Sequence, residues 1–191
     1  MKKWIARKIL KLLGWKIDGR QPRHEHYVLI AAPHTSNWDL PLLLLFAAAF
    51  DIRITWLAKH NLFFPPMGWI MRALGGMPIV RHRNTNVVSS LIETFADIPE
   101  LVLVVPTEGT RSRVEFWKSG FYHIAHGAGV PIVPSYLDYS RKVGGFGKAL
   151  TTTGNMTEDM NYFREFYAPV QGKYPAQFGP IKLREEESLI E

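Results

Sequence analysis

The sequence contains no cysteine, and none of its apolar runs is long enough to cross a lipid bilayer. Without cysteine there are no disulfide bonds, thiolate nucleophiles or thiolate metal ligands, which is typical of a protein of a reducing compartment. The longest charge-free apolar run, at 40–50, is much shorter than the ~20 residues of a transmembrane helix. Because 47% of the 191 residues are hydrophobic, we instead expect one domain with a sizeable core.

An excess of charge of either sign is also missing from most of the chain. Residues 1–20 contain seven Lys and Arg residues and one acid, whereas the remaining chain contains 16 basic and 16 acidic residues. The whole net charge of +6 therefore comes from the N-terminus. Nucleic-acid binding is not expected, because it usually requires basic charge spread over one face of the domain.

The basic N-terminal segment, residues 1–19, has the pattern of an amphipathic helix that ends near Gly14. Such a helix, with Trp4 and Trp15 near its ends, suits a membrane interface. The alternative is an ordinary amphipathic helix that packs on its own domain. A secretory signal peptide is not expected, because charges interrupt the apolar residues. The apolar and basic residues would lie on opposite faces, with Ile5, Ile9, Leu12 and Leu13 on one and Lys3, Arg7, Lys8 and Lys11 on the other.

Short apolar runs typical of buried strands alternate along the chain with segments of helical pattern. This alternation predicts an α/β domain over residues 20–170, with a mainly parallel sheet flanked by helices. The Pro- and Gly-rich tail, 171–191, is expected to be extended or loosely packed. The expected strands are 27–32, 52–58, 77–80, 101–105 and 130–137, and the expected helices are 38–50, 67–74, 85–97, 118–128 and 157–167.

His34 and Asp39 follow the first expected strand and lie five residues apart. In one regular helix their side chains would point ~140° apart and could not easily meet. With His34 in a loop and Asp39 in the first helical turn, the carboxylate would hold one imidazole nitrogen and leave the other as a general base. The alternative is a loop histidine beside an Asp that serves the helix dipole. Since no G-x-S-x-G pattern is present, a catalytic histidine would activate a hydroxyl of the substrate.

A second polar stretch, PTEGTRSR (106–113), follows the fourth expected strand and suits a phosphate group. Gly109 lets backbone amides approach an anion, and Arg111 offers a rigid fork of donors. Arg81 is a second candidate phosphate ligand, and Lys118 is a weaker one. The alternative is a charged surface loop with an internal ion pair. Ligands of parallel sheets bind beyond the carboxyl ends of strands, so these loops and the His34 loop are expected to converge there.

No metal site is expected. His24-Glu25-His26 has the residue types of a metal ligand set, but it lies in an expected loop and no third ligand follows at helical spacing. We interpret it as solvated polar surface.

Four blocks follow one another along the chain, and they read PHTSNWD (33–39), GMPIVR (76–81), VPTEGTRS (105–112) and VPIVP (130–134). Their order and spacing resemble those of the glycerolipid acyltransferases, which include bacterial lysophosphatidic acid acyltransferases. The blocks of that family are N-H-x4-D, G-x-x-x-[IV]-x-R, F-P-E-G-T-R-S and V-P-[IV]-[IV]-P. The chain departs from them at Pro33, where the family often has Asn, and at Thr107, where it usually has Pro.

The resemblance implies an O-acyltransferase in phospholipid biosynthesis. It would move a fatty acyl group from an acyl thioester, acyl-CoA or acyl carrier protein, to the hydroxyl of a lysophospholipid, with 1-acylglycerol 3-phosphate as the first candidate. His34 would be the base and Asp39 its partner. The acceptor, chiefly its phosphate, would be held by Arg81, Glu108, Gly109, Thr110 and Arg111.

The resemblance implies no metal or bound organic cofactor. It also implies work at a membrane surface, as a peripheral protein on the cytoplasmic face of the inner membrane. Two alternatives stay open, namely an acyltransferase for another lysolipid or an amino-acid-derived lipid, and a non-catalytic membrane-binding module on the same fold.

Overall fold

Residues 1–79 and 87–189 are described by the computed structural model of the chain. Within them, seven strands form one sheet in the order β1-β7-β6-β2-β5-β3-β4. All neighbouring strands are parallel except β6 and β7, so the predicted α/β fold with a mainly parallel sheet is confirmed. The strands are β1 (Lys16–Asp18), β2 (His26–Ala31), β3 (Ile54–Lys59), β4 (Gly76–Ile79), β5 (Leu101–Val105), β6 (Ile132–Asp138) and β7 (Val143–Phe146).

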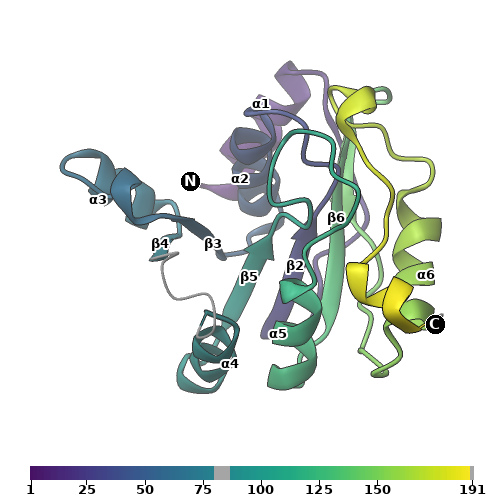
Figure 1. The fold of residues 1–191 in the computed structure, drawn as a ribbon. Coiled ribbons are helices and arrows are strands. Elements are labelled where there is room, and N and C mark those ends of the chain that lie inside the picture. Colours follow the sequence, from purple (N-terminus) through teal and green to yellow (C-terminus); the bar gives the residue numbers. More distant parts are fainter. Residues whose placement is uncertain (80–86, 190–191) are drawn as a thin grey trace.

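Helices cover both faces of this sheet (Figure 1). One face carries α1 and α2, the other carries α4, α5 and α6, and α3 stands out beyond β3 and β4. The α-helices are α1 (Lys3–Leu12), α2 (Asp39–Phe50), α3 (Met67–Ala73), α4 (Val87–Asp97), α5 (Gly120–Ala128) and α6 (Met156–Tyr167), and the 3-10 helices are η1 (His60–Leu62), η2 (Pro175–Gln177) and η3 (Arg184–Leu189).

The central strands β2 and β5 are the continuous apolar runs of the sequence. They pair in parallel with Ile30 opposite Val105, and both are buried over almost their whole length. Successive side chains point to opposite faces, so Leu29 enters the core under α1 and α2 while Val28 and Ile30 enter the other core. Burial on both faces explains why these strands lack polar alternation.

The strands β1 and β7 were not predicted from the sequence. β1 has only three residues, and β7 reads VGGF, with two glycines in a run of four. The two glycines allow close packing, because a Cβ on Gly145 would lie 2.2 Å from the Asp18 carbonyl oxygen. Gly145 thus permits the β1–β7 pairing that extends the sheet.

The N-terminal helix α1 packs on α2. Ala6 and Leu10 are fully buried, and the Nε of Arg7 donates to the Ala49 carbonyl at 3.1 Å. The face of α1 that carries Ala6 and Leu10 therefore packs on its own domain, as one of the two interpretations of this helix predicted. Trp4, Leu12 and Leu13 remain exposed, so the helix also presents apolar side chains to its surroundings. Within the described residues, no helix has both the length and the apolar composition to span a bilayer.

The expectation of a loosely packed C-terminal tail is wrong. Leu183 is fully buried in the core, and its backbone forms an isolated parallel β-bridge with Trp117. Glu186 forms an ion pair with Arg164 of α6. Nearer its start, the Tyr174 amide donates to the Thr35 hydroxyl at 3.2 Å. Proline and glycine in this segment produce turns, but the side chains between them reach fixed partners on the domain.

Candidate active site

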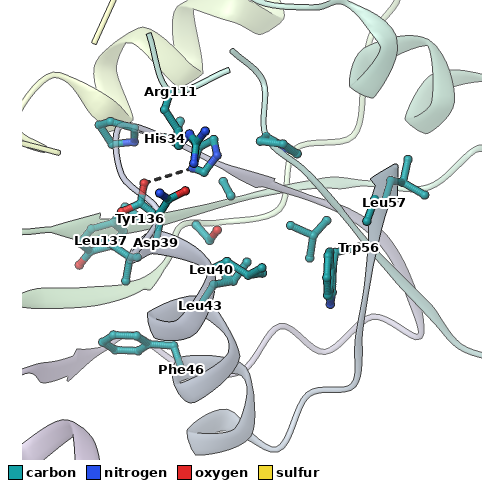
Figure 2. Close-up of a pocket in the computed structure, with 18 of the residues that line it drawn as sticks. His34, Asp39, Leu40, Leu43, Phe46, Trp56, Leu57, Arg111, Tyr136 and Leu137 are labelled. Carbon is teal, nitrogen blue, oxygen red and sulfur yellow. Dashed lines mark hydrogen bonds and ion pairs between the residues drawn. The ribbon is translucent and has the colours of Figure 1, made fainter. Parts of the chain in front are cut away.

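The loops that follow β2 and β5 begin side by side at one edge of the sheet. Because Ile30 pairs with Val105, the segments 33–39 and 106–113 leave the sheet at the same level. The predicted convergence of these two loops is thus seen in the structure (Figure 2). Arg81, which was expected in a third loop, lies outside the described residues.

His34 and Asp39 come together as the loop-to-helix spacing predicted. His34 lies in the loop and Asp39 opens α2, with His34 Nδ1 3.1 Å from Asp39 Oδ2. The same oxygen accepts the amides of Thr35 at 3.0 Å and Ser36 at 2.9 Å, which fix the carboxylate. A carboxylate beside Nδ1 makes that nitrogen the proton donor, so Nε2 is left free to accept a proton.

Tyr139 is a third member of this group. Its hydroxyl donates to Asp39 Oδ1 at 2.7 Å, and its amide donates to the Gln171 carbonyl at 2.9 Å. The Trp15 ring packs edge-on against the Tyr139 ring, with 5.1 Å between the ring centroids. Burial and the hydrogen bond to Asp39 raise the pKa of the Tyr139 hydroxyl, which therefore remains a donor. Tyr139 follows β6, outside all four sequence blocks, and no local pattern marked it.

Glu108 holds the loop that carries His34 through a hydrogen bond to its backbone. The side chain is only 2% exposed, and its Oε1 accepts the His34 amide at 2.9 Å. Burial raises the pKa of Glu108, while the hydrogen bond from the His34 amide opposes that rise. The fully buried Thr107 hydroxyl lies 3.4 Å from Oε2, so this departure from the family pattern supplies a second donor. Glu108 was expected to hold the acceptor, whereas here it contacts the backbone of the loop that carries His34.

Residues 109–113 of the 106–113 loop are exposed. Gly109 has a φ of 67°, and the side chain of Lys118 lies over it, 3.3 Å from where a Cβ would be. Thr110 lies beside it, with its hydroxyl 3.4 Å from the Ser112 amide. Arg111 lines the same cavity as His34. Of the predicted phosphate ligands in the described residues, Arg111 is therefore the one that lines this cavity.

A cavity of about 520 Å³ opens from the His34–Asp39 pair. His34, Asp39 and Arg111 line its polar end, and Leu40, Leu43 and Phe46 follow one another along α2 away from His34 (Figure 2). The remaining wall is mostly apolar and includes Trp56, Leu57, Ala58, Leu62, Val104, Leu137 and Phe146. The cavity thus joins a proton acceptor and a cation to a long apolar space.

The C-terminal tail holds the two site loops together. The side-chain amide nitrogen of Gln177 is assigned to the position facing two carbonyl oxygens, those of Arg111 at 2.7 Å and Thr35 at 2.9 Å. Gly172 packs against Pro33 and Thr35, where a Cβ would lie 2.8 Å from the Thr35 hydroxyl. Sequence reasoning missed these contacts because the tail is far from both loops along the chain.

His24-Glu25-His26 is not part of this site. His26 lies at the start of β2, and its ring is 6.1 Å from that of Phe95. Over residues 1–79 and 87–189, no three or more His, Cys, Asp or Glu side chains are grouped to hold a metal ion.

Comparisons with known proteins agree with this geometry. No curated protein matches the chain. Among solved structures, the crystal structure of the 1-acyl-sn-glycerophosphate (LPA) acyltransferase PlsC from Thermotoga maritima matches with a TM-score of 0.60 and 19% identity, over 86% of this chain and 74% of that one, which shows a shared fold. A family model described as Acyltransferase matches residues 15–138. Since this match spans more than half of the sequence, the chain belongs to the acyltransferase family and is an acyltransferase enzyme.

Proposed function

We propose that this enzyme transfers a fatty acyl group from an acyl thioester, on coenzyme A or acyl carrier protein, to the hydroxyl of a lysophospholipid, with 1-acylglycerol 3-phosphate as the leading acceptor. The observation that carries the proposal is the position of the His34–Asp39 pair at the polar end of an apolar cavity of about 520 Å³. A fatty acyl chain needs such an apolar space, and a hydroxyl acceptor needs a base at its end.

The chemistry follows from the arrangement of the pair. His34 Nε2 removes the proton of the acceptor hydroxyl, and the oxygen attacks the thioester carbonyl carbon. Asp39 stabilises the imidazolium that forms, through Nδ1. The tetrahedral intermediate then collapses, the carbon–sulfur bond breaks, and the imidazolium returns its proton to the leaving thiolate. The products are the ester and the free thiol.

Two further groups have roles in this proposal. Arg111 at the polar end of the cavity binds the phosphate of the acceptor, with Lys118 beside the Gly109 loop and Arg81 as additional candidates. Glu108 fixes the His34 loop through the His34 amide.

We also propose a peripheral position on the cytoplasmic face of the inner membrane, where the basic helix α1 with exposed Trp4, Leu12 and Leu13 contacts lipid.

The first test replaces the proposed base. His34→Ala should lower turnover of acyl-CoA and 1-acylglycerol 3-phosphate by roughly 10²–10⁴-fold, because a positioned general base contributes about that factor. His126→Ala is the matched control, since His126 lies on α5 across the sheet and contacts Thr152. The measurement is product formation in mixed micelles or vesicles. Turnover that persists in His34→Ala would exclude the assigned role.

The second test addresses the acceptor. Arg111→Ala should raise the KM for 1-acylglycerol 3-phosphate by about ten-fold or more while changing kcat less, because a charge-assisted bond to the phosphate is lost. The same change should leave the KM for 1-acylglycerol, which has no phosphate, nearly unaltered. Arg53→Ala, just before β3 at the opposite edge of the sheet, is the control. Equal effects on both acceptors would exclude Arg111 as the phosphate ligand and leave another lysolipid or an amino-acid-derived lipid open as the acceptor.

A further inference from the structure

Exposed apolar side chains gather around α3. Thirteen large apolar side chains are exposed in the described residues, and six of them fall between positions 62 and 74. Clusters of this kind on a protein surface mark contact sites, whereas single exposed apolar residues are common. We call these six the α3 surface; they are Leu62, Phe64, Met67, Trp69, Ile70 and Leu74.

The orientation of the α3 surface is fixed by contacts on the inner side of the helix. A Cβ on Gly68 would lie 2.3 Å from the Phe63 carbonyl oxygen, and the Trp56 indole donates to the Leu74 carbonyl at 2.8 Å. Met71 packs against the core under α1 and α2. The outward side chains are therefore held away from the domain while the helix itself is attached to β3. Figure 1 shows α3 standing clear of both helical layers.

The sequence around the α3 surface carries charge of one sign. The described residues 54–79 and 87–92 include no Asp or Glu, whereas Lys59 and Arg72 are basic. Arg72 on α3 itself lies over the Phe63 ring at 5.3 Å. Basic residues beside exposed tryptophan and phenylalanine are the composition of a surface that enters the headgroup region of an anionic bilayer.

The α3 surface and the cavity share one residue. Leu62 is 41% exposed and also lines the cavity, whose lining includes Leu57 and Ala58 of β3. Leu62 therefore offers an apolar contact for a chain that enters the cavity from the α3 surface. No exposed residue of α1 lines the cavity, and this distinguishes α1 from the α3 surface.

We propose that the α3 surface inserts into an anionic lipid bilayer and that the acyl chain of a membrane lipid enters the cavity along Leu62. The proposal rests on the lipid acyltransferase function proposed above. It assigns α3, in addition to α1, as the contact that places the mouth of the cavity against the membrane.

The test compares the same substitution at two exposed isoleucines of the full chain. Ile70 is 52% exposed on α3, and Ile98 is 37% exposed after α4, where it adjoins neither the cavity nor α1. Ile70→Asp should lower binding to vesicles of phosphatidylcholine with phosphatidylglycerol by about ten-fold or more, because it removes apolar burial and adds a repelled charge. Ile98→Asp should bind like the wild type. Helix α1 is unchanged in both variants, so its contribution cancels.

Turnover gives a second measurement. Ile70→Asp should lose about ten-fold in activity on a long-chain lysolipid in vesicles, yet keep wild-type activity on a short-chain lysolipid dissolved as monomers. Phe64→Asp, at 57% exposure, is the second variant if Ile70→Asp proves unstable in thermal unfolding. A wild type inactive on both acceptors would contradict the proposed function, whereas the vesicle-binding comparison would still decide the role of α3.

Three results would overturn the inference. One is equal vesicle binding by Ile70→Asp and Ile98→Asp. Another is binding of the wild type to pure phosphatidylcholine as tight as to anionic vesicles. The third is a wild-type dimer in sedimentation that Ile70→Asp converts to monomer while vesicle binding stays unchanged, which would make the α3 surface a contact between two copies of the chain.

Discussion

Two buried aspartates, Asp39 and Asp159, lie on opposite faces of the sheet in almost the same surroundings. Each is in the first turn of a helix and accepts a tyrosine hydroxyl at 2.7 Å. From the loop before its helix, Asp39 accepts two backbone amides and Asp159 accepts one. Asp159 is completed by the hydroxyl of Thr153 at 3.1 Å, whereas Asp39 is completed by the imidazole of His34. One set of contacts therefore serves both a structural carboxylate and a proposed catalytic one.

The shared contacts have a common physical cause. A carboxylate in the first helical turn meets unpaired amides and the positive end of the helix dipole, and a tyrosine hydroxyl satisfies a remaining lone pair. A buried carboxylate with a tyrosine partner is therefore what a stable helix start requires, and these two features alone do not indicate catalysis. The difference is the imidazole of His34 with a free Nε2 on an open cavity. Asp39 serves the helix start and the histidine at once, so the two interpretations of the sequence are compatible.

The largest contrast is expected when both carboxylates lose their charge. Asp39→Asn should lower kcat by about 10²–10⁴-fold, because an amide neither fixes the productive tautomer nor stabilises the imidazolium. Asp159→Asn should leave kcat near the wild-type value and lower the free energy of unfolding by about 1–3 kcal/mol through its buried hydrogen bonds. Steady-state kinetics and urea unfolding of both variants measure this. A comparable loss of kcat in both would remove the distinction.

A smaller contrast is expected for the tyrosines. Tyr139→Phe should lower kcat about 2–10-fold with KM unchanged, because the loss of one hydrogen bond of about 0.5–1.5 kcal/mol loosens Asp39 behind His34. Tyr122→Phe, which loses the matching bond to Asp159, should reduce stability by a similar amount without changing kcat. Tyr139 is thus assigned as a positioning residue. If both variants lose stability and neither loses kcat, its role is structural only.

The pattern of buried strands was predictable because apolar periodicity reports burial directly. Runs such as 101–105 could only be buried on both faces, and the spacing of His34 and Asp39 required a loop before the helix. The three-residue β1 was not predictable, because its pairing depends on a close approach to Gly145 rather than on its own composition.

The surroundings of the site were much harder to infer. Tyr139 lies 100 residues from Asp39 and Glu108 lies 74 from His34, so no local pattern connects either pair. Glu108 was also expected at the substrate, because the family resemblance implied a role in holding the acceptor. Its burial depends on the amide of another loop, which only the folded chain provides.

The contacts of the C-terminal tail have a consequence for the time at which the enzyme becomes active during its synthesis. All four sequence blocks have been translated by residue 134, but Tyr139, the Gln177 amide that spans Thr35 and Arg111, and the buried Leu183 come later. A nascent chain that has all of its motifs therefore still lacks the residues that hold them in place. We expect the site to assemble only after residue 183 has emerged from the ribosome.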